Sequence, residues 1–114
     1  MAGVTILDLE GPLVFGEGDR ALKDRVNALM HQGERQLLLN LRGITALDSG
    51  GVGALVWKYV TVTRQGGQLK LMNLSERTHN VLMIAKLLTV FEVFGSEAEA
   101  LKSFEGTRPG APSW

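Results

Sequence analysis

The chain has 114 residues, 45% of them hydrophobic, with 12 basic and 12 acidic side chains, and this length predicts one domain around one core. Because the net charge is zero and cysteine is absent, the composition argues against a nucleic-acid partner and excludes disulfides, thiol catalysis and cysteine metal sites. Charges or glycines interrupt each apolar run well before membrane length, so we expect a cytoplasmic protein without membrane insertion.

The N-terminal part predicts two short strands and a helix. Val4–Leu9 and Leu13–Phe15 have strand character, and Gly11-Pro12 between them predicts a turn, so we expect a hairpin. Asp19 is the expected N-cap of a helix that stops at Gly33. The apolar face of this helix consists of Leu22, Val26, Leu29 and Met30.

The middle of the chain predicts a buried strand followed by a helix. Leu37–Leu41 is almost continuously apolar, as in a strand covered on both faces, and Ile44 and Leu47 return the chain to the core. From Ser49 to about Gln65 the apolar residues recur with the period of a helix, and Ser49 is the expected N-cap. The apolar face expected to contact the sheet consists of Val52, Leu55, Val56, Tyr59, Val60 and Thr63.

The C-terminal part predicts two more strands and two more helices. Gln68–Met72 and Val90–Phe94 are the expected strands. Ser75 is the expected cap of a helix that carries Val81, Leu82, Ala85 and Leu88. Ser96 and Glu99 have the spacing of a capping box, which opens the last helix.

The order β-β-α-β-α-β-α-β-α predicts an α/β fold with a mixed, mainly parallel sheet of four to five strands and about four helices. We assign residues 1–104 to this domain. Residues 105–114 contain two glycines and two prolines and are expected to form a flexible tail.

Two interpretations of Ser49 stay open from the residues alone. In the first, Ser49 caps the helix and Asp48 makes a local turn bond. In the second, the free N–H groups and the positive dipole end of the helix make Ser49 a phosphorylation site. Trp57 is either an aromatic anchor of a docking surface or a side chain packed under the C-terminal segment or a neighbouring helix.

Catalysis has little support in the sequence. Leu47 stands where the serine-hydrolase motif G-x-S-x-G needs its first glycine. Gly50, Gly51 and Gly53 are not followed by the Gly-Lys-Ser/Thr sequence that a nucleotide-binding P-loop requires. We therefore expect no enzyme, no catalytic residue, no cofactor and no metal site.

The segment from Asp48 to Gly53, DSGGVG, with LLLNLRGITAL before it and GGQLKLMNLS and SEAEAL after it, resembles the STAS domain of bacterial anti-sigma factor antagonists. The resemblance extends from Leu37 to about Phe104. It implies a protein that binds an anti-sigma factor with serine kinase activity and thereby frees a sigma factor. It also implies phosphorylation on Ser49, which ends this binding, and a phosphatase that restores it. The expected partner-binding residues are Asp48, Ser49, Gly50, Gly51, Gly53 and Trp57.

The chain departs from the family pattern at two positions. Gly50 replaces a serine or threonine, and Val14 replaces the carboxylate of a Gly-Glu-Leu-Asp segment. Two alternatives stay open: a STAS scaffold or transporter-accessory domain that does not switch partners, and a small nucleotide-binding domain. Loss of partner binding when an acidic residue replaces Ser49 would favour the switch.

Overall fold

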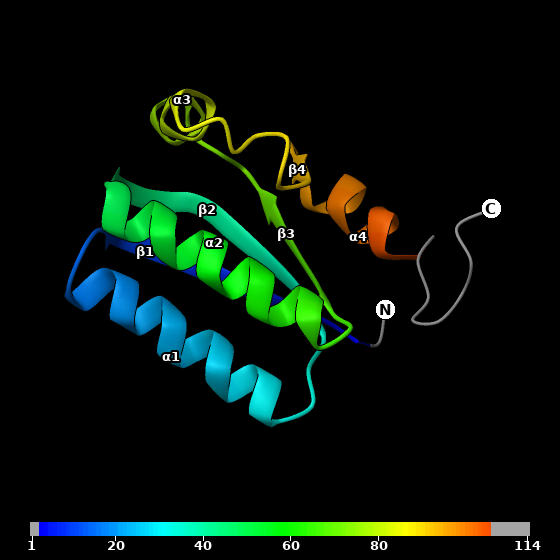
Figure 1. The fold of residues 1–114 in the computed structure, drawn as a ribbon. Helices are drawn as coiled ribbons and strands as arrows, with labels where there is room; N and C mark the ends of the chain where they lie inside the picture. Colours follow the sequence, from blue (N-terminus) through cyan, green and yellow to red (C-terminus); the bar gives the residue numbers. More distant parts are fainter. Residues whose placement is uncertain (1–2, 106–114) are drawn as a thin grey trace.

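The structure, a computed structural model, describes residues 3–105 as a four-stranded sheet with four helices (Figure 1). The strands lie in chain order across the sheet: β1 (Val4–Leu13), β2 (Gln36–Leu47), β3 (Gln68–Met72) and β4 (Val93–Phe94). The helices are α1 (Glu17–His31), α2 (Ser49–Arg64), α3 (Glu76–Ile84) and α4 (Glu97–Glu105). Each described strand pair is parallel. The prediction of one α/β domain with four helices is confirmed.

The helices form two layers around the sheet. In Figure 1, α1 and α2 lie side by side over one face, α4 lies on the opposite face, and α3 lies near the ends of β2 and α2. Leu37, Leu39 and Leu41 belong to the larger core under α1 and α2. Leu38 belongs to the smaller core, where it is buried together with Phe104 of α4. The predicted two-sided burial of β2 is therefore confirmed.

The predicted N-terminal hairpin is wrong, because β1 is one strand that runs parallel to β2. Gly11 and Pro12 do not reverse the chain, and irregularities in the register between β1 and β2 accommodate this segment. β1 is an edge strand, where a proline without an N–H group is tolerated. The chain turns only after Leu13, so Phe15 lies in the loop that leads into α1.

The helix caps agree with the sequence at α3 and α4 but not at α1. The hydroxyl of Ser75 accepts the Thr78 N–H at 3.1 Å, and that of Ser96 accepts the Glu99 N–H at 3.2 Å. The prediction that Asp19 is an N-cap is wrong. Gly16 is the N-cap instead, and its N–H donates to the carboxylate of Asp19, which lies in the first turn of the helix, at 3.0 Å.

Several boundaries also differ from the predictions. β2 continues past Leu41 to Leu47, α3 ends at Ile84, before the predicted Leu88, and β4 is only two residues long. Glu105 is the last residue of α4, and the rest of the predicted tail, residues 106–114, lies outside the described residues. Within residues 3–105, no helix is long and apolar enough to cross a membrane.

Candidate functional site

Asp48 is the N-cap of α2, so the prediction that Ser49 is the cap is wrong. The Oδ1 atom of Asp48 accepts the Gly51 N–H at 3.0 Å. Ser49 is the first residue of the helix, and its side chain is exposed. Because the carboxylate already accepts a first-turn N–H group, the Ser49 hydroxyl is not needed for capping and faces solvent.

The same carboxylate fastens the loop before α1 to the start of α2. The Phe15 N–H donates to both oxygens of Asp48, at 3.0 and 3.1 Å. The N–H groups of Gly51 and, to a lesser degree, Phe15 lower the pKa of Asp48. A negative charge therefore stands directly before Ser49 at neutral pH.

Two of the glycines in the DSGGVG segment are required by close packing. A Cβ on Gly50 would lie 2.6 Å from the Cα atom of Phe15, and one on Gly51 would overlap the Leu13 carbonyl oxygen. A Cβ on Gly53 would meet no atom within 4 Å. The end of β1 and the loop after it therefore press against the first turn of α2, and only glycine allows that approach.

An exposed stripe follows α2 from its first turn. It consists of Ser49, Gly53, Trp57 and Val60, which are spaced three or four residues apart along the helix. Trp57 is 64% exposed, so of its two interpretations the packed one does not hold among the described residues. The stripe brings Ser49 and Trp57 onto one face, as a docking surface requires.

The buried face of α2 is rotated from the predicted one. Ala54 and Lys58 are buried, whereas Val60 and Thr63 are exposed, because α2 packs against α1 as well as against the sheet. The ammonium of Lys58 donates to Asn27 Oδ1 of α1 at 2.7 Å. Burial lowers the pKa of Lys58, and the neighbouring charge of Lys23 acts in the same direction.

Phe15 is a surface residue that the sequence pattern did not predict. This residue is 80% exposed, although the apolar pattern placed it in a strand. The glycines at positions 16 and 18 signal that the chain is already turning there. Val14, the other departure in this segment, is half-buried, and its carbonyl accepts the Asp19 N–H at 3.0 Å.

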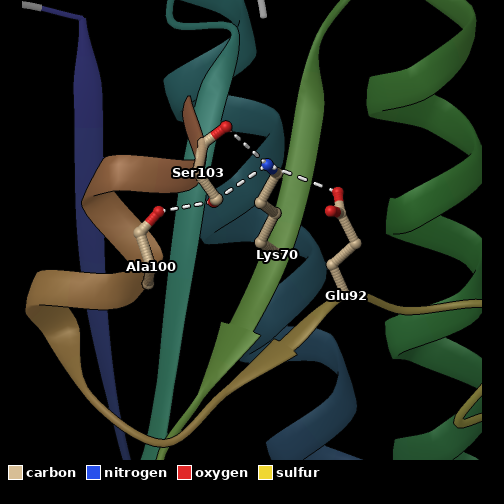
Figure 2. Close-up of polar contacts among 4 residues, drawn as sticks. All are labelled: Lys70, Glu92, Ala100 and Ser103. Carbon is tan, nitrogen blue, oxygen red and sulfur yellow. Dashed lines mark hydrogen bonds and ion pairs between the residues drawn. The ribbon is translucent and has the colours of Figure 1, made fainter. Parts of the chain in front are cut away.

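A second polar cluster lies between β3 and α4 (Figure 2). The ammonium of Lys70, which is only 3% exposed, donates to the hydroxyl and the carbonyl of Ser103, at 2.9 and 3.3 Å. It also lies 3.3 Å from the Glu92 carboxylate and 4.5 Å from the centre of the Phe104 ring. The Ser103 hydroxyl donates to the Ala100 carbonyl.

A serine beside a lysine can form a nucleophilic pair, but this geometry does not provide one. A lysine that activates serine must accept the hydroxyl proton on a neutral amine. Here the three donors of an ammonium match three acceptors, two on Ser103 and one on Glu92. The cluster therefore fastens α4 to the sheet.

Two of the pockets on the surface of the described residues are the best formed. One of about 440 Å³ is lined by Arg42, Asn73 and His79 among others, and one of about 280 Å³ lies between β1 and α1. Neither Ser49 nor Trp57 lines either of them. No group of three or more His, Asp or Glu side chains comes together as for a metal ion in the described part of the chain.

The fold and the site together define a class of protein. The described residues form a small parallel α/β domain that presents an exposed serine on the first turn of a helix. The family profile of the STAS domain matches residues 2–100, and the chain belongs to this family.

Individual relatives agree with this assignment. The anti-sigma F factor antagonist of Paenibacillus polymyxa is 23% identical over 103 residues, which cover 90% of this chain and 88% of the relative. A Thermotoga maritima protein proposed to be an anti-sigma factor antagonist has the same fold, with a TM-score of 0.85 and 22% identity over 92% of this chain and 90% of that one. A sulfate transporter family protein of Wolinella succinogenes also has this fold, with a TM-score of 0.74 and 22% identity over 92% and 87% of the chains.

Proposed function

We propose that this protein is an anti-sigma factor antagonist that acts by partner switching. In its unphosphorylated form it binds an anti-sigma factor with serine kinase activity and so frees a sigma factor; phosphorylation on Ser49 ends the binding, and a phosphatase restores it. The observation that carries the proposal is the exposed Ser49 side chain on the first turn of α2, in line with the exposed Trp57. The name of the Paenibacillus relative supports the same role.

The electrostatics around Ser49 suit a switch. A phosphate adds roughly −1.5 to −2 charges at neutral pH, and Asp48 beside it is already ionised. If the interface is built around a neutral hydroxyl, the partner must either bury this charge or fail to bind. Burying an unpaired charge costs several kcal/mol. That amount is on the order of the difference between micromolar and undetectable binding. The protein itself performs no catalysis in this scheme.

The test uses the purified kinase-type anti-sigma factors encoded by the source genome. Each is mixed with the chain and ATP, and the modified residue is mapped by mass spectrometry. Binding of the wild type, Ser49→Ala and Ser49→Asp is measured by calorimetry. We expect phosphate on Ser49, retained binding by Ser49→Ala and no binding by Ser49→Asp. Phosphate only at other residues, or equal binding by both variants, would contradict the switch.

The likeness in fold to a sulfate transporter family protein favours a second candidate, in which the chain is an accessory of a membrane transporter. This candidate predicts a stable complex that ATP and charge at Ser49 leave unchanged. The same variants therefore separate the two functions.

A further inference from the structure

We propose that Phe15 is an aromatic anchor for the anti-sigma factor and that the partner receives it in an apolar pocket beside Ser49. This inference rests on the proposed function and adds the contact that determines which partner fits. Phe15 comes from the loop before α1, outside the exposed stripe of α2.

The side chain of Phe15 is exposed while its backbone is fixed. Phe15 is 80% exposed, whereas its N–H group donates to both carboxylate oxygens of Asp48. The next residue, Gly16, donates its N–H to Asp19 at 3.0 Å, which fixes the loop on the other side. Because the backbone of this loop is already fixed, binding orders only the side chain, and aromatic residues, phenylalanine among them, are enriched in the cores of protein interfaces.

Phe15 also lies against the two residues that flank Ser49. Its backbone contacts the residues on both sides of that serine, Asp48 through hydrogen bonds and Gly50 through close packing. Any side chain at position 50 would overlap the backbone and Cβ of Phe15, so Gly50 is the residue that lets Phe15 take this place. A partner that covers Ser49 therefore covers Phe15 as well.

The neighbourhood of Phe15 also explains why the switch would be effective. A pocket that receives a phenyl ring is apolar and excludes water. A phosphate at its edge, on Ser49, would lose hydration without gaining a partner. The pocket thus strengthens the effect of phosphorylation, which a polar contact surface would tolerate better.

The test compares two side chains of equal exposure. Phe15 and Ile84 are each 80% exposed, but Ile84 lies at the end of α3. Calorimetry with the anti-sigma factor kinase that binds the wild type is expected to show at least tenfold weaker binding by Phe15→Ala. Ile84→Ala is expected to bind within twofold of the wild type, and Phe15→Leu should lose less than Phe15→Ala. Both alanine variants should unfold at the wild-type midpoint, because neither removes a core contact.

Two results would overturn the inference while leaving the proposed function in place. One is binding by Phe15→Ala within twofold of the wild type, in an interaction that Ser49→Asp abolishes. The other is an equal loss from Ile84→Ala. If Ser49→Asp binds as tightly as the wild type, or if none of the kinases binds the wild type, the proposed function fails and the inference fails with it.

Discussion

Asp48 couples the helix cap, the loop before α1 and the charge beside Ser49. Its pKa is lowered from the ordinary value of 3.8, mainly by the N–H groups of Gly51 and Phe15. A carboxylate with a lowered folded-state pKa contributes stability above the ordinary pKa, and this contribution disappears as the pH falls through the lower, folded-state value. The contribution of Asp48 should therefore be complete at neutral pH and decline below about pH 4.

We predict that Asp48→Asn unfolds at a lower temperature than the wild type at pH 7. The gap between the two midpoints should shrink as the pH is lowered from 5 to below 3.8, because the wild-type carboxylate becomes neutral as well. Thermal unfolding followed by circular dichroism across this range measures both midpoints. A gap that stays constant with pH would show that the ionised form of Asp48 has no special role.

Gly50 and Gly53 provide a matched pair on the same turn of α2. Gly50→Ala places a methyl group against the backbone of Phe15 and should destabilise the protein by roughly 1–3 kcal/mol. Gly53→Ala points into open space and should stabilise the helix by about 0.5–1 kcal/mol. Urea unfolding of the two variants measures the difference. Equal effects would mean that the approach of Phe15 to α2 is looser than the structure shows.

At the scale of elements, α4 depends on the buried lysine of β3. Lys70→Ala removes its hydrogen bonds to Ser103 and its packing against Phe104, and should cost roughly 2–4 kcal/mol. Glu92→Gln should cost at most about 1 kcal/mol, because the Glu92 side chain is 64% exposed. Chemical unfolding gives both values. In Lys70→Ala, amide hydrogen exchange should rise more in α4 than in α1. An equal rise in both helices would argue that Lys70 does not hold α4 locally.

At the scale of the whole molecule, the proposed switch needs no change of fold. Ser49 is exposed, and its side chain contributes nothing to either hydrophobic core. Charge at this position alters the surface offered to a partner, while the sheet and its helices keep their packing. Ser49→Asp is therefore expected to lose partner binding and to keep the wild-type unfolding midpoint. A large fall in that midpoint would mean that loss of binding reflects unfolding.

The parts of the fold with strong local patterns were predictable. The apolar run at Leu37–Leu41, the strand Gln68–Met72 and the cap at Ser75 depend on neighbouring residues, and the structure confirms all three. The location of Ser49 at the start of a helix was also predictable, because the period changes at that point. The hairpin prediction failed because Gly11 and Pro12, which are typical of turns, can also mark an irregularity in the pairing of two strands, as they do between β1 and β2.

The sequence by itself determined the fold class, the order of most elements and the position of an exposed serine at a helix start. Only the tertiary structure decided that Lys58 and Lys70 are buried and that Phe15 lies against Asp48 and Gly50, the two neighbours of Ser49. The reason is the range of the interactions. Periodicity and capping act over a few residues, whereas the bond from Phe15 to Asp48 spans 33 positions and exists only after β1, α1 and β2 have packed.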